Sequence, residues 1–226
     1  MSKFDIEIKK PKDQSYCEEA LFNGLYVNAG YKSKKGIDVA CEKIALVSLF
    51  EQIKHVKSAP GYRWNAAHIR FSMVPKKDQE LPGKEELAIS GHKALQAAKM
   101  AIKKRYPNAK IHYRWHLEHS PDAGWHYHVA IFTNGNQLIG TRAIETELHA
   151  YGVHSLESIK PDFSRMREGE ARDYFLSQGL EVDSSLNYLP LKNEIDFEYA
   201  LYWFSYMTKR ATKEAVSRST GGTQLK

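Results

Sequence analysis

Two histidines and one glutamate have the types and the spacing to bind a metal ion. His126 and His128 lie in the segment Trp-His-Tyr-His-Val-Ala-Ile-Phe, which follows Gly124 and is rich in β-branched and aromatic residues. Such a segment predicts a strand, and alternate side chains of a strand share one face. Glu118 lies on the preceding predicted strand, across a short turn, so its carboxylate can lie beside both imidazoles. Two imidazoles and a carboxylate suit a divalent metal and leave coordination positions open for a substrate.

A second set of residues lies near the C-terminal end of the chain. Tyr199, Tyr202, Tyr206, Lys209 and Lys213 are separated by steps of three and four. On a helix, with about 100° per residue, they fall within a stripe roughly 80° wide. A tyrosine has a pKa near ~10 and becomes a nucleophile when a nearby lysine stabilises the phenolate or the phosphate it attacks. The alternative is an aromatic rim that packs the helix onto a sheet.

The segments that would position these residues alternate between strand and helix patterns. Hydrophobic periodicity predicts the order strand, helix, strand, strand, helix, strand. This is the βαββαβ order of ferredoxin-like or RRM-like folds, so we expect an α+β protein with a largely antiparallel sheet, flanking helices and a C-terminal helix that carries the tyrosine. The six segments are 67–74, 84–105, 110–119, 125–133, 141–151 and 153–160.

Further helices are expected outside this unit. We predict a short helix near 17–25, a helix over 37–56, a short helix over 170–177, and a final helix from a cap at Asn193 or Asp196 to about residue 215. The final helix should bury Ala200, Phe204, Met207 and Ala211. The chain then divides into an N-terminal extension (1–66), a functional domain (67–215) and a flexible basic tail (216–226).

Composition limits the class of protein. The chain has 226 residues, 42% of them hydrophobic, a net charge of +6 and two cysteines. No apolar run approaches the ~20 residues that span a bilayer, and the N-terminus lacks the apolar centre of a signal peptide. Cys17 and Cys41 fit no metal-ligand motif, so we expect free thiols in a reducing cytoplasm. Basic residues interleaved with aromatics suit a groove for single-stranded nucleic acid.

The two sets of residues together resemble the motifs of a known superfamily. His126-Tyr127-His128 resembles the His-hydrophobe-His motif of the HUH endonucleases, and Tyr206-Met207-Thr208-Lys209 resembles their Tyr-x-x-Lys motif. The order, with the histidines first, resembles the rolling-circle replication initiators, and within them those of filamentous phages, phage satellites and prophage elements. The likeness covers roughly 67–213. Tyr127 departs from the usual hydrophobic residue, and the strand at 67–74 matches the family's first motif only loosely.

The resemblance implies a mechanism and a set of partners. Glu118, His126 and His128 would hold Mg²⁺ or Mn²⁺, and Tyr206, assisted by Lys209, would attack DNA to form a 5′-phosphotyrosine and a free 3′-hydroxyl. Tyr202 is either a second nucleophile or a platform on which bases stack. The partners would be single-stranded origin DNA and, since the chain has no Gly-x-x-x-x-Gly-Lys-[Ser/Thr] loop, a host helicase and polymerase in the bacterial cytoplasm. The residues expected to contact DNA are Arg114, Tyr199, Lys209, Arg210 and Lys213.

Two other classes of function remain open from the sequence. One is a non-enzymatic module that binds single-stranded nucleic acid through aromatic residues and a basic tail. The other is a different metal-dependent hydrolase, in which the histidine pair binds Zn²⁺ and the tyrosines are structural. A covalent protein–DNA product, binding without cleavage, or cleavage without a covalent product would distinguish the three.

Overall fold

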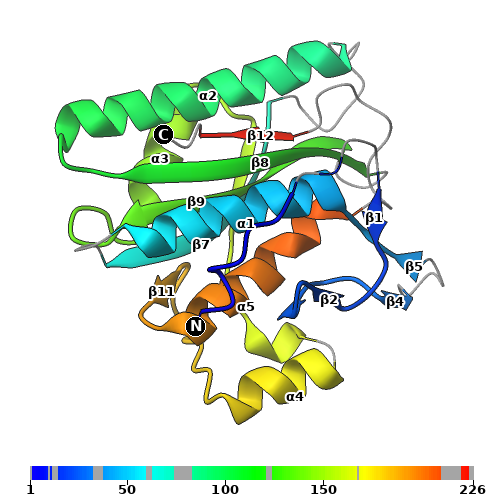
Figure 1. The fold of residues 1–226 in the computed structure, drawn as a ribbon. Helices are drawn as coiled ribbons and strands as arrows, with labels where there is room; N and C mark the ends of the chain where they lie inside the picture. Colours follow the sequence, from blue (N-terminus) through cyan, green and yellow to red (C-terminus); the bar gives the residue numbers. More distant parts are fainter. Residues whose placement is uncertain are drawn as a thin grey trace.

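The computed structural model describes residues 2–9, 11, 15–32, 38–59, 63–73, 83–120, 124–166, 168–209 and 220–223. Its centre is one large antiparallel sheet with the strand order β10-β7-β9-β8-β12 (Figure 1). A further strand, β11 (Leu189–Leu191), pairs with β7 beside β10. The prediction of an α+β protein with a large antiparallel sheet is confirmed. The strands of the main path are β7 (Trp64–Ser72), β8 (Ile111–Ser120), β9 (Gly124–Asn134), β10 (Ser155–Ile159) and β12 (Thr220–Gly222).

Two helices, α2 (Lys84–Arg105) and α3 (Arg142–Ala150), cover one face of the sheet. Their apolar stripes form one core with every second residue of β9, including Tyr127, Val129 and Ile131. Helix α2 approaches the sheet closely at Gly91, where an added Cβ atom would overlap the ring of Tyr127. The side of β9 opposite the histidine pair is therefore fully covered by helices, as the alternating pattern predicts.

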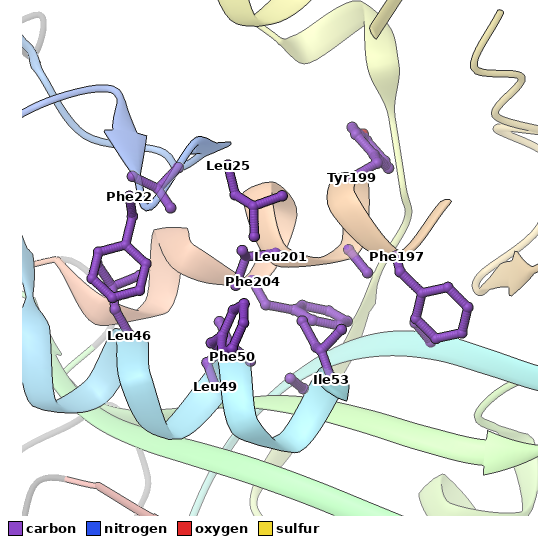
Figure 2. Packing of buried hydrophobic residues seen from close by; sticks show 14 of the residues in the cluster. Phe22, Leu25, Leu46, Leu49, Phe50, Ile53, Phe197, Tyr199, Leu201 and Phe204 are labelled. Atoms are coloured by element: carbon purple, nitrogen blue, oxygen red, sulfur yellow. The ribbon is translucent and has the colours of Figure 1, made fainter. Parts of the chain in front are cut away.

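The other face of the sheet packs against α1 (Lys43–Ser58) and α5 (Glu194–Ser205). Ala130 and Phe132, which alternate with the residues of the first core, belong to this second core. Figure 2 shows side chains of α1 and α5 pointing toward one another, with Phe22 and Leu25 from the N-terminal segment beside them. Residues 1–66, which we expected as an extension, thus supply part of the core that holds α5. The labelled members are Phe22, Leu25, Leu46, Leu49, Phe50, Ile53, Phe197, Tyr199, Leu201 and Phe204.

Helix α5 begins at the predicted cap. The Asn193 side chain accepts a hydrogen bond from the Asp196 backbone N–H, and the Asp196 carboxylate accepts one from the Asn193 N–H, which is a capping box. Ala200, Phe204 and Met207 are buried as expected, and Ala211 lies outside the described residues. The predicted end of the helix near residue 215 is wrong, because α5 ends at Ser205 and a 3₁₀ turn, η2 (Tyr206–Thr208), follows it.

The N-terminal segment differs from the prediction. The expected helix near 17–25 is replaced by a hairpin of β2 (Leu21–Phe22) and β3 (Leu25–Tyr26), in which Asn23 and Gly24 have φ values of 51° and 75°. Two positive φ values in a two-residue loop favour a hairpin over a helix. Helix α1 starts at Lys43 rather than near residue 37, because the preceding residues pair in short strands. These strands are β1 (Tyr16–Cys17), β2 (Leu21–Phe22), β3 (Leu25–Tyr26), β4 (Tyr31–Lys32), β5 (Asp38–Val39) and β6 (Cys41–Glu42).

Part of the expected flexible tail forms an edge strand. Thr220, Gly221 and Gly222 pair as β12 with His116, Trp115 and Arg114 of β8. A Cβ atom at Gly221 would lie 2.7 Å from the indole of Trp115, so the backbone can approach this edge only because the residue is glycine. The remaining helix, α4 (Glu170–Ser177), lies where it was predicted and buries Phe175 in the core of α5.

Candidate active site

The predicted metal ligands meet on one face at the paired ends of β8 and β9. The antiparallel register places Glu118 opposite His126 and His116 opposite His128. One carboxylate oxygen of Glu118 lies 3.5 Å from Nε2 of His128 and 3.9 Å from Nε2 of His126. The possible ligand atoms of the three residues lie within 4.8 Å of one another, and all three side chains are buried. This group could hold a metal ion.

The orientation of the His126 ring is fixed by the backbone. Its Nδ1 lies 2.9 Å from the carbonyl oxygen of Gly124, and because a carbonyl only accepts, Nδ1 carries the proton. The bare Nε2 therefore faces Glu118. Burial lowers the pKa of His126, and the charges of Arg70 and His119 act in the same direction. A neutral imidazole whose second nitrogen donates to a carbonyl is the usual form of a metal-binding histidine.

His128 is held by another histidine. Its Nδ1 lies 3.0 Å from Nε2 of His68 on the neighbouring strand β7. Burial, followed by the charges of His68 and His126, places the pKa of His128 well below its usual value. Burial and Arg70 lower the pKa of His68 to about 3. The site therefore offers neutral imidazoles beside one carboxylate, a donor set that suits a divalent cation.

Tyr206 lies beside this group. Its ring centroid is 6.1 Å from that of His128, and 43% of the residue is exposed. Burial of the hydroxyl raises the pKa of Tyr206; the negative charge of Glu118 raises it further, while Arg70 opposes the shift. At neutral pH the side chain is therefore a neutral phenol, which needs nearby positive charge to become a nucleophile.

Lys209 contacts the ring of Tyr206 rather than only following it in sequence. Its ammonium nitrogen lies 3.6 Å from the ring centroid and donates a hydrogen bond of 2.6 Å to the hydroxyl of Tyr31. The backbone of Lys209 forms an isolated bridge with Cys41, whose buried thiol donates a hydrogen bond to the Ser205 carbonyl. The N-terminal segment thus fixes the lysine that covers one face of the candidate nucleophile.

A cleft of about 440 Å³ lies beside His128, which lines it, whereas His126 and Glu118 are not among its lining residues. Tyr202, Trp203 and Tyr206 contribute aromatic rings to its lining, and His68 and His128 contribute imidazoles. Arg70 also lines the cleft, lies opposite His128 in the strand register and forms an ion pair with Glu157 at 2.5 Å. The remaining lining residues are Asn28, Tyr31, Glu157, Ile159, Lys160, Asp162, Met166 and Tyr199.

The other residues predicted from the sequence to belong to the site line the cleft, lie away from it, or fall outside the described residues. Tyr202 lines the cleft and stacks on Tyr199, with ring centroids 6.4 Å apart. Tyr199 is only 3% exposed and also packs on Phe175. Arg114 is half-buried beside β12 and is not among the described residues that line the cleft. The two other cations expected to contact DNA, Arg210 and Lys213, lie outside the described residues.

Three residues of the site were missed from the sequence. His68 and Arg70 are two positions apart on a strand, so they share one face, and most of the other residues of that strand are apolar or small. This pair of polar residues on one face was the signal that could have identified them. The contribution of Tyr31 could not be found in this way. It comes from β4, which lies distant in the sequence and contacts Lys209 only in the folded chain.

Comparisons of the chain with protein-family models, with curated proteins and with solved structures give no match. In the described part of the chain, every helix is too short or too polar to cross a membrane.

Proposed function

We propose that this chain is a metal-dependent DNA nickase and strand transferase of the HUH class that initiates rolling-circle replication. The observation that carries the proposal is the distance of 6.1 Å between the ring centroids of Tyr206 and His128. A candidate nucleophile and a candidate metal ligand, distant in the chain, lie together at one cleft. The proposal also depends on the resemblance of both motifs to those of rolling-circle initiators.

The topology supports a ferredoxin-like assignment within this proposal. The elements β7, α2, β8, β9, α3 and β10 follow one another in the βαββαβ order, and their strands pair antiparallel in one sheet. In this assignment the two histidines lie on the inner strand β9, and Tyr206 follows the helix that packs across the same face. Tyr206 is the first residue after the C-terminal end of α5.

Glu118, His126 and His128 would hold Mg²⁺ or Mn²⁺, which when bound polarises a non-bridging oxygen of the scissile phosphate. The donor set fits this role because both imidazoles are neutral, and because the Gly124 carbonyl directs Nε2 of His126 to the site. The carboxylate of Glu118 supplies the negative charge that favours a cation over a neutral ligand.

The reaction exchanges one phosphoester for another. The Tyr206 oxygen forms a bond to phosphorus and the phenol loses its proton, while the bond from phosphorus to the 3′ oxygen breaks and that oxygen gains a proton. The products are a 5′-phosphotyrosine and a free 3′-hydroxyl that can prime synthesis. Attack of a 3′-hydroxyl on the phosphotyrosine reverses these steps and reseals the strand, so no further reactant is required.

Positive and aromatic side chains would bind the DNA. Arg70 faces the cleft, and its guanidinium can bind phosphate oxygens in place of the Glu157 carboxylate. Lys209 holds the Tyr206 ring, and Tyr202 either stacks an unpaired base or acts as a second nucleophile. Arg114, Tyr199, Arg210 and Lys213 remain proposed DNA contacts. A host helicase and polymerase in the bacterial cytoplasm would complete the replication machinery.

A labelled single-stranded library tests the proposal without knowledge of the origin sequence. Oligonucleotides with a randomised centre are incubated with the protein and Mn²⁺, then analysed under denaturing conditions. A 3′ label should migrate with the protein, because the 5′-phosphotyrosine retains the 3′ portion, and a 5′ label should appear in a shorter free strand. Cleavage without a covalent product would favour a metal-dependent hydrolase, and binding without cleavage would favour a nucleic-acid-binding module.

A further inference from the structure

His68 lies behind the candidate metal ligand His128. It is 2% exposed, and its Nε2 lies 3.0 Å from Nδ1 of His128. On its other side the ring makes edge contacts with Trp203 and Phe204 of α5, with centroids 5.8 and 6.0 Å away. His68 therefore lies between a candidate ligand and the helix that precedes Tyr206.

The hydrogen bond between the two histidines limits where their protons can lie. Nε2 of His128 faces Glu118, so a metal can bind there only if that nitrogen has a free lone pair. The proton of neutral His128 is then on Nδ1, and it must be donated to Nε2 of His68. In the opposite arrangement His68 donates to Nδ1, and His128 carries its proton on Nε2, where it blocks the metal.

We propose that His68 is a positioning residue that accepts the Nδ1 proton of His128 and so holds His128 in its metal-binding tautomer. The inference rests on the metal site of the proposed function, but it does not require that the protein nick DNA. It assigns a role to a buried histidine that neither motif contains.

The surroundings of His68 support this role. The rings of Trp203 and Phe204 fix its orientation, and Nε2 is directed at His128. Nδ1 of His68 has no hydrogen-bond partner among the described residues. Among the described residues, the contact with His128 is therefore the only hydrogen bond of the His68 ring. Replacing a residue that hydrogen-bonds a ligating histidine typically changes metal affinity 10–100-fold.

The inference is tested by measuring Mn²⁺ binding in the absence of DNA. Free Mn²⁺ is followed by electron paramagnetic resonance during titration of the wild type, His68→Leu, His68→Gln and His112→Leu. We expect His68→Leu to weaken Mn²⁺ binding roughly 10–100-fold, because it removes the acceptor. His68→Gln should bind within a few-fold of the wild type, because its amide oxygen can accept the same proton. His112 lies on the same sheet face, six positions from Glu118 along β8, so His112→Leu should retain wild-type affinity.

Thermal unfolding in EDTA shows whether each variant is folded, and imidazole NMR gives a second readout. With ¹⁵N-labelled protein saturated with Mg²⁺, the rings of His128 and His68 should both show the proton on Nδ1. Wild-type affinity of folded His68→Leu, loss of binding in His68→Gln, or a proton on Nε2 of His68 would each overturn the inference. If the protein forms no DNA adduct but its Mn²⁺ binding depends on His68, the proposed nickase activity is wrong and this inference still stands.

Discussion

The ammonium nitrogen of Lys209 lies 3.6 Å from the centroid of the Tyr206 ring, and the same nitrogen donates a hydrogen bond to Tyr31. A cation over the face of an aromatic ring attracts it and restrains its position. We therefore expect Lys209→Met, which keeps the chain length but removes the charge, to slow formation of the DNA adduct by roughly 10–100-fold. Tyr31→Phe, which removes only the hydrogen bond, should slow it less.

For Lys209→Met and Tyr31→Phe, the single-turnover rate of adduct formation is measured, and DNA affinity is determined separately by fluorescence anisotropy. A lysine that positions the ring should change the rate much more than the affinity. If Lys209→Met weakens DNA binding as much as it slows the reaction, Lys209 contacts the phosphate instead.

Replacement of the two cleft tyrosines should have different effects. Tyr206→Phe removes the attacking oxygen while keeping the ring that contacts His128, so it should retain DNA binding and form no covalent product. Tyr202→Phe should still form the first adduct, because Tyr202 stacks on Tyr199 within the cleft wall. Denaturing gels with 3′-labelled DNA give the result. An adduct formed by Tyr206→Phe and absent in Tyr202→Phe would reverse the assignment.

Metal binding should be visible as thermal stabilisation that depends on Glu118. An ion at 100 times its dissociation constant adds about 2.7 kcal/mol to the free energy of unfolding, which is roughly 5–10 °C for a chain of this size. Glu118→Gln should lose this shift. In EDTA, however, it should unfold at the wild-type temperature or above it, because the variant no longer buries a carboxylate. If Mn²⁺ raises the unfolding temperature of Glu118→Gln as much as that of the wild type, Glu118 is not a metal ligand.

Arg70 and Glu157 form a matched pair of substitutions at the mouth of the cleft. If the guanidinium binds phosphate in competition with Glu157, Arg70→Gln should weaken binding of single-stranded DNA about 10-fold, and Glu157→Gln should strengthen it. Anisotropy titrations at several salt concentrations test this. The Arg70 variant should also show a shallower salt dependence, because one phosphate contact is lost. Unchanged affinity in both variants would show that the ion pair is only structural.

The free energy of unfolding should fall with acidification partly because of His112, which lies six positions along β8 from Glu118 of the candidate metal site. Burial, with the positive charges of His55 and nearby lysines, lowers its pKa to about 4 from 6.5. Between these values the unfolded chain binds more protons than the folded chain, so the free energy of unfolding decreases as the pH falls from 6.5 to 4. His112→Phe should flatten this dependence by an amount on the order of 2 kcal/mol, measured by urea denaturation. If the free energy of unfolding depends on pH in the same way in the variant and the wild type, the lowered pKa of His112 is contradicted.

Much of the sheet and its helices could be predicted from periodicity. The helix predicted over 84–105 is α2 (Lys84–Arg105), and the strands around the histidine pair lie within one residue of their expected positions. Long segments with one repeating pattern have few alternative structures. Alternation on β8 and β9 also placed Glu118, His126 and His128 on one face, because the pairing register follows from the short turn between the strands.

The features that could not be predicted depend on contacts distant in the sequence. Residues 37–42 have apolar residues at helical spacing, but Cys41 pairs with Cys17 in an extended conformation, and this long-range pairing overrides the local pattern. Likewise, the helix pattern continues past Ser205, whereas the chain forms a 3₁₀ turn that places Lys209 against Tyr31. Neither partner is identifiable before the fold is known.

The core shared by α5 and the N-terminal segment makes the proposed catalytic centre inseparable from the chain that precedes β7. Phe22, Leu25 and Phe50 pack with Phe204, and Cys41 and Tyr31 contact Lys209 directly. A fragment cut before β7 would retain both motifs and yet lack the residues that support the candidate nucleophile. Transferring the proposed activity to another protein would therefore require the whole chain rather than the segment that the motifs delimit.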